Sequence, residues 1–360
     1  MIKAKSVTLY DVADQAGVSY QTVSRVINQA AHVSAKTRHK VEQAMAALNY
    51  VPNRVAQQLA GKQSYTLGLA TTDLALHAPS QIASSIKARA EALGFNVVIS
   101  MVREPHGETC RSAVNSLLSQ RVDGIIVNIP LEDAEAAALQ QACGVVPALF
   151  LDVSPALAVN SILFDPGQGA RLGVGHLLER GHRKIALVTG PRESVSARLR
   201  YEGWLNALAT HGLTPAGVAE GDWSAASGYA CTRSLMAQGA VTAILLGNDQ
   251  MALGALRALS ELGYAVPAQV SVVGYDDTED SAWFIPPLTT VRQDFLSLGA
   301  ASVERLVAQI RSPQQPHRVD VLAVTLSQRE TTAAPGDGQS PAQLARALSA
   351  LAHQVSKLSL

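Results

Sequence analysis

Cysteine, aromatic residues and charge are all scarce in this sequence, and long apolar runs are absent. The three cysteines, Cys110, Cys143 and Cys231, are far apart and form no CxxC pair, so neither a disulfide framework nor a zinc site is indicated. We expect them to be small buried side chains in a reducing cytosol. No stretch of about 18 apolar residues occurs, and the N-terminus lacks the apolar segment of a signal peptide, so we expect a cytoplasmic protein that does not enter a membrane.

The composition and the placement of charge indicate a globular protein with one basic end. At 360 residues, of which 48% are hydrophobic and 16% charged, the chain is long enough for two or three domains. Its formal net charge is zero, but residues 1–64 contain eight Lys and Arg against three Asp and Glu, so this end carries +5 and the rest −5. A basic end on an acidic body predicts contact with phosphates at one end only.

Residues 8–28, TLYDVADQAGVSYQTVSRVIN, have the pattern of a helix-turn-helix that binds DNA. Ala13 is small enough for two helices to approach, Gly17 suits a turn with positive φ, and Val23 fills the space between the helices. A second helix beginning near Ser19 would expose side chains that can hydrogen-bond base edges in the major groove. Those side chains are Tyr20, Gln21, Ser24 and Arg25. An ordinary pair of surface helices joined by a glycine turn is the alternative.

A third helix and a short isolated segment follow. Ser34 is placed to cap a helix whose apolar residues between 41 and 48 have the spacing needed to pack on the first two helices. Pro52 breaks the chain after it, and residues 53–60 then form a short helical segment that ends at Gly61. So short a helix is not stable alone in water, and its ordering should therefore depend on a partner.

From residue 66 the pattern changes to short apolar runs that alternate with longer amphipathic stretches. The runs TLGLATT, FNVVISMV, DGIIVNI, PALFLDV, KIALVTG, TAILLGND and QVSVVGYDD predict buried strands, and residues 80–93, 107–120 and 134–142 predict helices. Nearly continuous apolar strands alternating with helices indicate parallel sheets covered on both faces, here in two doubly wound lobes. Polar residues at strand ends should line a cleft between the lobes, and Asp152, Asn248 and Asp276 each end a strand.

The C-terminal residues predict a linker and an assembly helix. Residues 331–341, TTAAPGDGQSP, are polar and rich in Pro and Gly. After them, apolar residues repeat at the alternating spacing of 4 and 3 that marks a heptad seam. The seam residues are Leu344, Leu348, Leu351, Val355 and Leu358. Such a short helix needs several copies to be stable, and packing onto its own body is the alternative.

The chain resembles the LacI/GalR family of transcription repressors nearly from end to end. The motifs that carry the resemblance are TLYDVADQAGVSYQTVSRVINQA, YVPNRVAQQLAGKQS, LALHAPSQI, SARLR, EGDWSA, NDQMALGA, VVGYDDTEDS and PPLTTVRQDF. It implies a three-helix DNA-binding headpiece, a hinge helix, a core of two lobes like that of periplasmic binding proteins, a linker and a tetramerisation helix. These parts would span 1–52, 53–63, 64–330, 331–341 and 342–360. The lobes would comprise about 64–164 with 293–320, and about 165–292 with 321–330.

The resemblance implies three groups of DNA-binding residues. Tyr20, Gln21 and Arg25 would read bases, as their hydrogen-bonding groups allow. Phosphates would be contacted by Thr8, Ser19, Thr22, Asn28 and Ser34. For each hydroxyl in this group, helix capping is an equal alternative. Two hinge helices would enter the minor groove through Asn53, Val55, Ala56, Gln57 and Leu59. Leu59 would wedge between base pairs and kink the duplex, and an ordinary packing role is its alternative.

For the cleft, the resemblance implies a sugar effector. Hydroxyl groups need acceptors and fork-shaped donors, supplied by Asp152, Arg200, Asn248, Asp276 and Gln293, and Trp223 would cover the apolar face of the ring. An apolar wall would comprise Leu76, Pro79, Ile82 and Phe295, with Asn128, Phe164 and Ser196 as further candidates. A surface charge or a helix cap is the alternative for any one carboxylate. His77, Lys87 and Asp280 resemble positions that respond to lobe movement, and His77 and Asp280 could pair.

We therefore expect a sugar-responsive repressor that binds a two-fold symmetric operator in double-stranded DNA and is released by a galactoside-type inducer such as allolactose. It would act as a homodimer, and as a dimer of dimers that loops DNA. The alternatives are a repressor for another sugar or a purine, a sugar receptor without DNA binding, and an enzyme with a doubly wound fold. Neither GxGxxG after the first strand nor GxxxxGK[ST] occurs, so we expect no cofactor and no catalysis.

Overall fold

In a computed structural model, the chain divides into two compact units, Met1–Tyr65 and Thr66–Leu360. The structure describes residues 7–27, 33–51, 63–104, 106–314, 316–336, 348–349 and 351. Across these ranges, no helix has both the length and the apolar content that a bilayer crossing requires.

The first unit contains three helices, α1 (Leu9–Ala16), α2 (Tyr20–Ile27) and α3 (Ala35–Ala47), as the sequence predicts. Gly17 ends α1 with φ of 63°, because a residue with no Cβ adopts the left-handed turn without strain. Val23, together with Val12 and Val41, is completely buried between the helices. Such a small core fixes the angle between α1 and α2, and with it the surface that α2 exposes.

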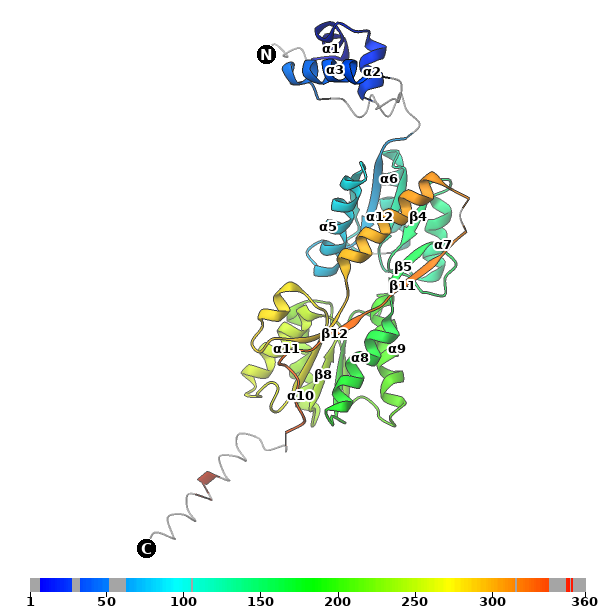
Figure 1. Ribbon diagram of the computed structural model, residues 1–360. Helices are drawn as coiled ribbons and strands as arrows, with labels where there is room; N and C mark the ends of the chain where they lie inside the picture. The colour runs from blue at the N-terminus through cyan, green and yellow to red at the C-terminus, as the bar shows by residue number, and fades with distance from the viewer. Residues whose placement is uncertain are drawn as a thin grey trace, which may run out of the picture. The chain divides into compact units, whose positions relative to one another are not determined.

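The second unit begins with a lobe built on a six-stranded sheet in the order β11-β5-β4-β3-β1-β2, and all of its strand pairs are parallel (Figure 1). Its strands are β1 (Thr66–Thr71), β2 (Asn96–Met101), β3 (Gly124–Asn128), β4 (Ala148–Phe150), β5 (Ser161–Phe164) and β11 (Val319–Leu322). Its helices are α5 (His77–Ala92), α6 (Gly107–Ser119), α7 (Asp133–Ala142) and α12 (Phe295–Arg311). Two separate apolar clusters pack on the sheet, so both of its faces are covered.

The other lobe of this unit repeats the plan with the order β12-β10-β9-β8-β6-β7, in which only β12 runs antiparallel to its neighbour. Its strands are β6 (Ile185–Thr189), β7 (Gly217–Glu220), β8 (Ala243–Leu246), β9 (Ser271–Asp276), β10 (Thr289–Arg292) and β12 (Thr325–Ser327). Its helices are α8 (Pro166–Glu179), α9 (Val195–Ala209), α10 (Ala225–Gln238), α11 (Asp249–Glu261) and the 3-10 helix η1 (Glu279–Trp283). The predicted fold of two parallel-sheet lobes is confirmed.

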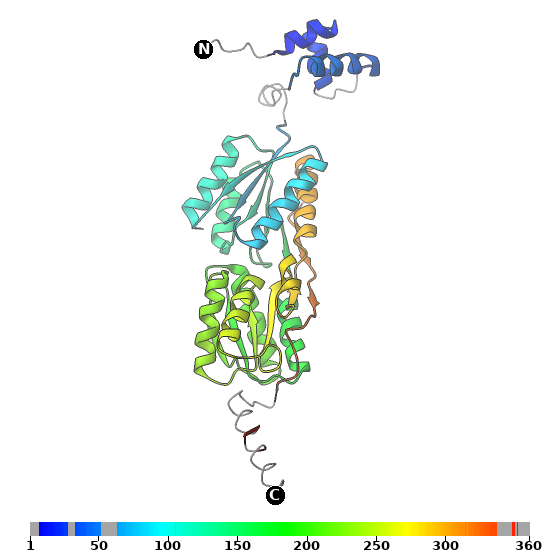
Figure 2. The same cartoon turned by 90° about the vertical axis from the view of Figure 1, so that its left-hand side faces the viewer.

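The chain passes between the lobes three times, after β5, after β10 and after β11, along one side of the unit (Figure 2). The strands β5, β7, β10, β11 and β12 were not predicted from the sequence as separate elements. β7, β11 and β12 are edge strands of three or four residues with partly exposed side chains, so they lack the continuous apolar run that marks a buried strand. Because the carboxyl ends of the parallel strands meet the lobe boundary, polar residues that follow them are brought together there.

Two of the three cysteines are buried, as the sequence predicts. Cys110 and Cys143 are buried, whereas Cys231 is half-buried on α10, and all three are free thiols. Burial raises the pKa of the Cys143 thiol to about 11, so this side chain stays neutral and behaves as a small apolar group.

Candidate functional site

A cavity of about 510 Å³ lies between the two lobes of the second unit. This volume is within the range of small-molecule sites, roughly 300–1,000 Å³. The thirteen side chains predicted to bind an effector all lie on its wall: Leu76, Pro79, Ile82, Asn128, Asp152, Phe164, Ser196, Arg200, Trp223, Asn248, Asp276, Gln293 and Phe295. They come from both lobes and from one of the passages between them, so a molecule in the cavity would contact both lobes at once.

Arg200 is the centre of the polar wall. It extends from α9 and is buried, with an exposed fraction of 8%. Its Nη1 donates a hydrogen bond of 2.5 Å to the carbonyl oxygen of Gly247, and its Nη2 donates one of 2.9 Å to Oε1 of Gln293. The guanidinium also stacks 3.9 Å above the ring of Tyr275, which holds its plane in place. The remaining N–H groups of this fixed guanidinium can reach hydroxyl groups of a bound molecule.

Asp276 faces the same cavity from the end of β9. Its Oδ1 lies 3.6 Å from Nη2 of Arg200 and has no hydrogen-bond partner among the described residues. Burial raises the pKa of this carboxyl to about 7, although the charge of Arg200 acts in the opposite direction. A buried oxygen without a partner is costly unless a ligand supplies the missing donor, so this carboxyl is suited to a hydroxyl group.

Asp152 brings a second carboxyl to the cavity, from the first lobe. Burial raises its pKa to about 6, while the charge of Arg200 and a hydrogen bond from the backbone of Ser196 oppose the shift. Ser196 belongs to α9 of the second lobe, so this contact crosses the lobe boundary. Both carboxyls therefore titrate close to neutral pH and can accept or donate hydrogen bonds there.

Trp223 forms a flat aromatic surface in the second lobe. A Cβ atom at Gly190 would come within 2.2 Å of its ring, so the ring can lie in this position only because residue 190 is glycine. Asn248 caps α11 by accepting a hydrogen bond of 2.8 Å from the Met251 backbone, and its Nδ2 donates to the Trp223 carbonyl at 3.0 Å. Asn248 therefore caps a helix and also fixes the backbone of Trp223.

The first lobe contributes a mainly apolar surface to the cavity. Phe295, at the first turn of α12, meets the ring of Phe164 edge-on at 5.8 Å and lies 6.1 Å from the ring of His77. Ile82 of α5 is buried beside them, with an exposed fraction of 5%. Asn128 is also on this wall, but its Nδ2 donates to Oγ1 of Thr71 at 3.3 Å.

Several wall residues were missed by the sequence analysis. They include Thr72, Asp73, Arg103, Glu104, Glu193 and Gln250. Most of them belong to loops, where no periodic pattern marks which side chains face inward. No group of three or more His, Cys, Asp or Glu able to hold a metal ion occurs in the described part of the chain.

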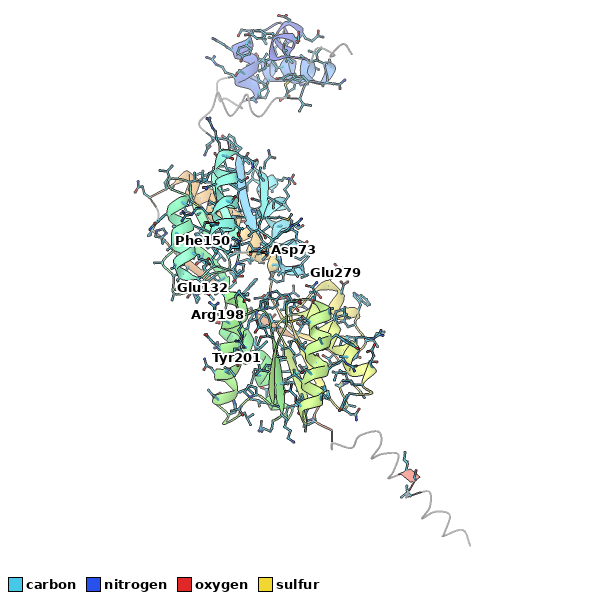
Figure 3. The ribbon with its side chains drawn as sticks, turned by 180° about the vertical axis from the view of Figure 1, so that it is seen from behind. Asp73, Glu132, Phe150, Arg198, Tyr201 and Glu279 are labelled. Carbon is cyan, nitrogen blue, oxygen red and sulfur yellow. The ribbon has the colours of Figure 1, made fainter. Side chains whose placement is uncertain are left out.

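Direct bonds between the lobes were also missed. Glu132, before α7, and Arg198 of α9 form a bidentate ion pair, with Oε1 2.7 Å from Nη1 and Oε2 3.1 Å from Nη2. Figure 3 shows these two side chains at one edge of the lobe boundary, with Asp73 and Glu279 at the opposite edge. The backbone N–H of His77 donates to Oε1 of Gln250 at 3.5 Å, which is a further bond between the lobes.

Of the three residues expected to respond to lobe movement, only His77 lines the cavity, whereas Lys87 and Asp280 lie outside its wall. His77 lines the cavity, and burial lowers its pKa while the charge of the exposed Asp280 acts to raise it. In the ranges that the structure describes, His77 and Asp280 form no ion pair, although the charge of Asp280 acts on His77. Lys87 pairs with Glu91, one turn further along α5.

On the first unit, the predicted base-reading side chains form one exposed surface of α2. Tyr20, Gln21 and Arg25 are all exposed, and Tyr20 stacks on Tyr10 of α1 with ring centres 4.8 Å apart. The hydroxyls of Thr8, Ser19 and Ser34 each accept a bond from a helix N-terminal N–H, and the Thr22 hydroxyl lies 2.9 Å from that of Ser19. The hydroxyls of Thr8, Ser19 and Ser34 therefore cap helices, although the adjoining helix N-termini remain suited to phosphate.

Some predicted residues lie outside the described part of the chain. They are Asn28, the hinge residues Asn53, Val55, Ala56, Gln57 and Leu59, and the heptad residues Leu344, Val355 and Leu358. Of the heptad seam, Leu348 and Leu351 are described, and their exposed fractions are 60% and 59%.

Comparison with known proteins adds independent evidence. Residues 8–53 match the family model "Bacterial regulatory proteins, lacI family", and residues 174–332 match a periplasmic binding protein-like domain. The lactose operon repressor of Escherichia coli is 58% identical over 98% of this chain and 99% of that protein. A crystal structure of the lac repressor dimer bound to operator and the anti-inducer ONPF has a TM-score of 0.87 and 58% identity, and covers 92% of this chain and all of that one. The lac repressor bound to ONPG in its repressed state has a TM-score of 0.86 and 57% identity, with 91% and 100% covered.

Proposed function

This chain belongs to the lacI family of bacterial regulatory proteins, and we propose that it is a transcriptional repressor that binds a two-fold symmetric operator and releases it when a galactoside-type sugar enters the cavity. The observation that carries the proposal is that one chain has both an exposed helix with Tyr20, Gln21 and Arg25 on its surface and a cavity lined by Arg200, Asp276 and Trp223. By family the chain is a regulator and not an enzyme. Because a repressor acts on bacterial DNA, we place it in the cytoplasm.

The polar wall supports a sugar as the effector. A pyranose carries several hydroxyls, each both donor and acceptor, around a ring with an apolar face. Arg200 offers fixed donors, Asp276 and Asp152 offer carboxyl oxygens, and Trp223 offers a flat ring for the apolar face. A galactoside is favoured because the relative that is 58% identical is a lactose operon repressor, and because ONPG binds the lac repressor.

The exposed surface of α2 supports sequence-specific DNA binding. Arg25 can bond a guanine bidentately, and Gln21 can bond an adenine, when α2 lies in the major groove. We infer that residues 53–63 form the hinge and that Leu59 wedges into the minor groove at the operator centre. Two copies of the chain would then bind the two halves of the operator, as a dimer does in the lac repressor complex.

We infer two-state allostery for the coupling between sugar and DNA. The second unit has two lobes joined by three passages, and a ligand in the cavity contacts both lobes. A sugar that binds one lobe arrangement better, and an operator that binds the other better, each lower the affinity for the other ligand by the same factor. Residues 342–360 would join two dimers into a tetramer that can hold two operators on one DNA molecule.

The test is fluorescence anisotropy of a labelled symmetric lac-type operator, titrated with the protein with and without methyl β-galactoside. We expect tight binding that the galactoside reverses. Tight binding that is indifferent to the galactoside but reversed by another sugar would contradict the choice of ligand alone. Absence of binding at low salt would contradict the DNA assignment, since phosphate contacts are strongest there.

A further inference from the structure

The backbone is strained where β9 ends at the cavity wall and turns into the following loop. Asp276 has φ of 113° and Asp277 has φ of 58°, both in the left-handed region that side chains other than glycine rarely occupy. Residues of this kind persist only where the surrounding structure holds them. Asp276 is 5% exposed, and its Oδ1 has no hydrogen-bond partner within the described ranges. The direction of this carboxyl therefore depends on whatever holds the turn.

Asp277 does not belong to the cavity wall. The residues that hold its side chain lie on or beside the neighbouring strands of the sheet. Its side chain is 7% exposed, and its Oδ1 accepts a hydrogen bond of 2.6 Å from Nη2 of Arg329. Its Oδ2 accepts one of 2.8 Å from the hydroxyl of Ser327 in β12 and lies 4.0 Å from Nη1 of Arg292 in β10. Three residues that are close to Asp277 only in the folded chain thus fix its carboxylate.

Arg329 is itself held by hydrogen bonds, so it can fix the position of the Asp277 carboxylate. Its Nη1 donates to the carbonyl oxygen of Leu288 at 2.7 Å, and its backbone N–H donates to Oγ1 of Thr289 at 2.9 Å. The next residue of the turn is also tied down, because the backbone N–H of Thr278 donates to Oδ2 of the buried Asp249 at 2.9 Å. The two residues after Asp276 are therefore both attached to other elements of the second lobe.

We propose that Asp277 and Arg329 are positioning residues for the effector, and that their ion pair holds the turn in the conformation that presents Asp276 to the galactoside. The inference rests on the function proposed above. Without the pair, the backbone of Asp276 can relax towards negative φ, which rotates its carboxyl away from the cavity. Neither Asp277 nor Arg329 touches the sugar, so the effect reaches the ligand only through Asp276.

The experiment compares Arg329→Met with a matched control, Arg305→Met. Arg305 also pairs with an aspartate, Asp320, at 2.8 Å, and its side chain is 14% exposed against 23% for Arg329, but it belongs to the first lobe and is not on the cavity wall. The dissociation constant of methyl β-galactoside is measured by calorimetry, below the thermal transition of each protein. We expect about a tenfold or greater increase for Arg329→Met and less than about twofold for Arg305→Met, with unchanged operator affinity in the absence of sugar for both.

Two further variants separate positioning from general damage. Arg329→Lys keeps a cation beside Asp277, so it should recover most of the lost sugar affinity. Asp277→Asn keeps a residue that tolerates the left-handed region but removes the charge, so it should weaken sugar binding less than Asp277→Ala.

Each contrary outcome contradicts a different statement. If Arg329→Met and Asp277→Ala both bind the galactoside as native protein does, the positioning role is wrong. If Arg329→Met weakens operator binding as much as sugar binding, the residue is only structural. A native protein that binds operator but not methyl β-galactoside would overturn the proposed effector, and this inference with it.

Discussion

The two lobes face the same cavity with different chemistry. The first lobe contributes the edge-on rings of Phe164 and Phe295 beside Ile82, whereas the second contributes Arg200 and Asp276 within a network of bonds. Hydrogen bonds depend on the direction and position of each hydroxyl, but apolar contacts depend mainly on the area covered. The difference predicts that discrimination between sugars depends mainly on the second lobe, with Asp152 as the carboxyl that the first lobe adds, and that the apolar part of the first lobe mainly excludes water.

Substitution of Arg200 is the strongest test of this division. Arg200→Leu removes two hydrogen bonds inside the protein and the fork that would bind the sugar, and it leaves Asp276 buried without a cation. We expect sugar affinity to fall by about 100-fold or more, because hydrogen bonds to charged groups contribute about 1.5–3 kcal/mol each. Operator binding should persist but no longer respond to galactoside in the anisotropy assay. Arg257→Leu, at an exposed pair on α11, is the control, and a normal response from Arg200→Leu would refute the assignment.

Truncation of Phe295 tests the apolar side. Phe295→Ala removes a ring that is 7% exposed and contacts both Phe164 and His77. We expect roughly a tenfold loss of galactoside affinity, together with a loss of stability of about 3–5 kcal/mol typical of a buried Phe. The ratio of galactoside to glucoside affinity should stay unchanged, whereas Asp276→Asn should change it. Calorimetric titration with both sugars measures the ratio, and a large change in Phe295→Ala would break the comparison between the lobes.

A change of pH should affect the polar part of the cavity wall and not the apolar part, because it changes the charge of the two carboxyls. The pKa of Asp276 is raised to about 7 and that of Asp152 to about 6, above the value of about 3.9 for an exposed aspartate. The folded state therefore binds more protons than the unfolded state between about pH 4 and 7, and this contribution makes the free protein more stable as the pH falls through that window.

Sugar binding should respond to pH in the opposite direction. Hydroxyls that donate to an ionised Asp276 favour the charged form, so affinity should fall severalfold from pH 8 to 6, with proton release on binding near pH 7. Calorimetry in buffers of different ionisation enthalpy measures that release. Asp276→Asn should lose most of the effect, and affinity that rises on acidification would contradict the assignment of the carboxylate as acceptor.

The smallest effect is expected at the edge where the lobes touch. Glu132→Gln breaks the ion pair with Arg198, whose side chains are 58% and 36% exposed, and such pairs contribute only about 0.2–1 kcal/mol. We expect sugar affinity to fall by no more than about threefold, and the difference to vanish at about 1 M salt.

A matched pair within one lobe provides the control for this edge. Glu304→Gln breaks the Arg89–Glu304 pair, whose atoms lie 2.6 Å apart and whose side chains, 39% and 53% exposed, both belong to the first lobe, so sugar affinity should not change. If both substitutions have the same effect, surface charge and not contact between the lobes accounts for it.

Local sequence determined those elements whose signals are local. Gly17 after a short amphipathic helix, and Ser34 before another, specify the ends of α1 and α3 through hydrogen bonds within a few residues. The nearly continuous apolar runs of β1 and β9 likewise predict strands buried on both faces, and all six residues of each are buried. Resemblance to the family then supplied most of the other residues predicted for the cavity wall, but not the loop residues such as Asp73 and Arg103.

Only the tertiary structure decided how those residues are held. The Asp277–Arg329 pair spans 52 positions of the chain and the Glu132–Arg198 pair spans 66, and no periodic pattern links positions so far apart. Whether Asn248 caps a helix, and whether the oxygen of Asp276 is left without a partner, depends on which backbone groups surround them after folding. Strain, burial and the pKa values of the cavity carboxyls are properties of that packing, so they do not exist until the two lobes have formed.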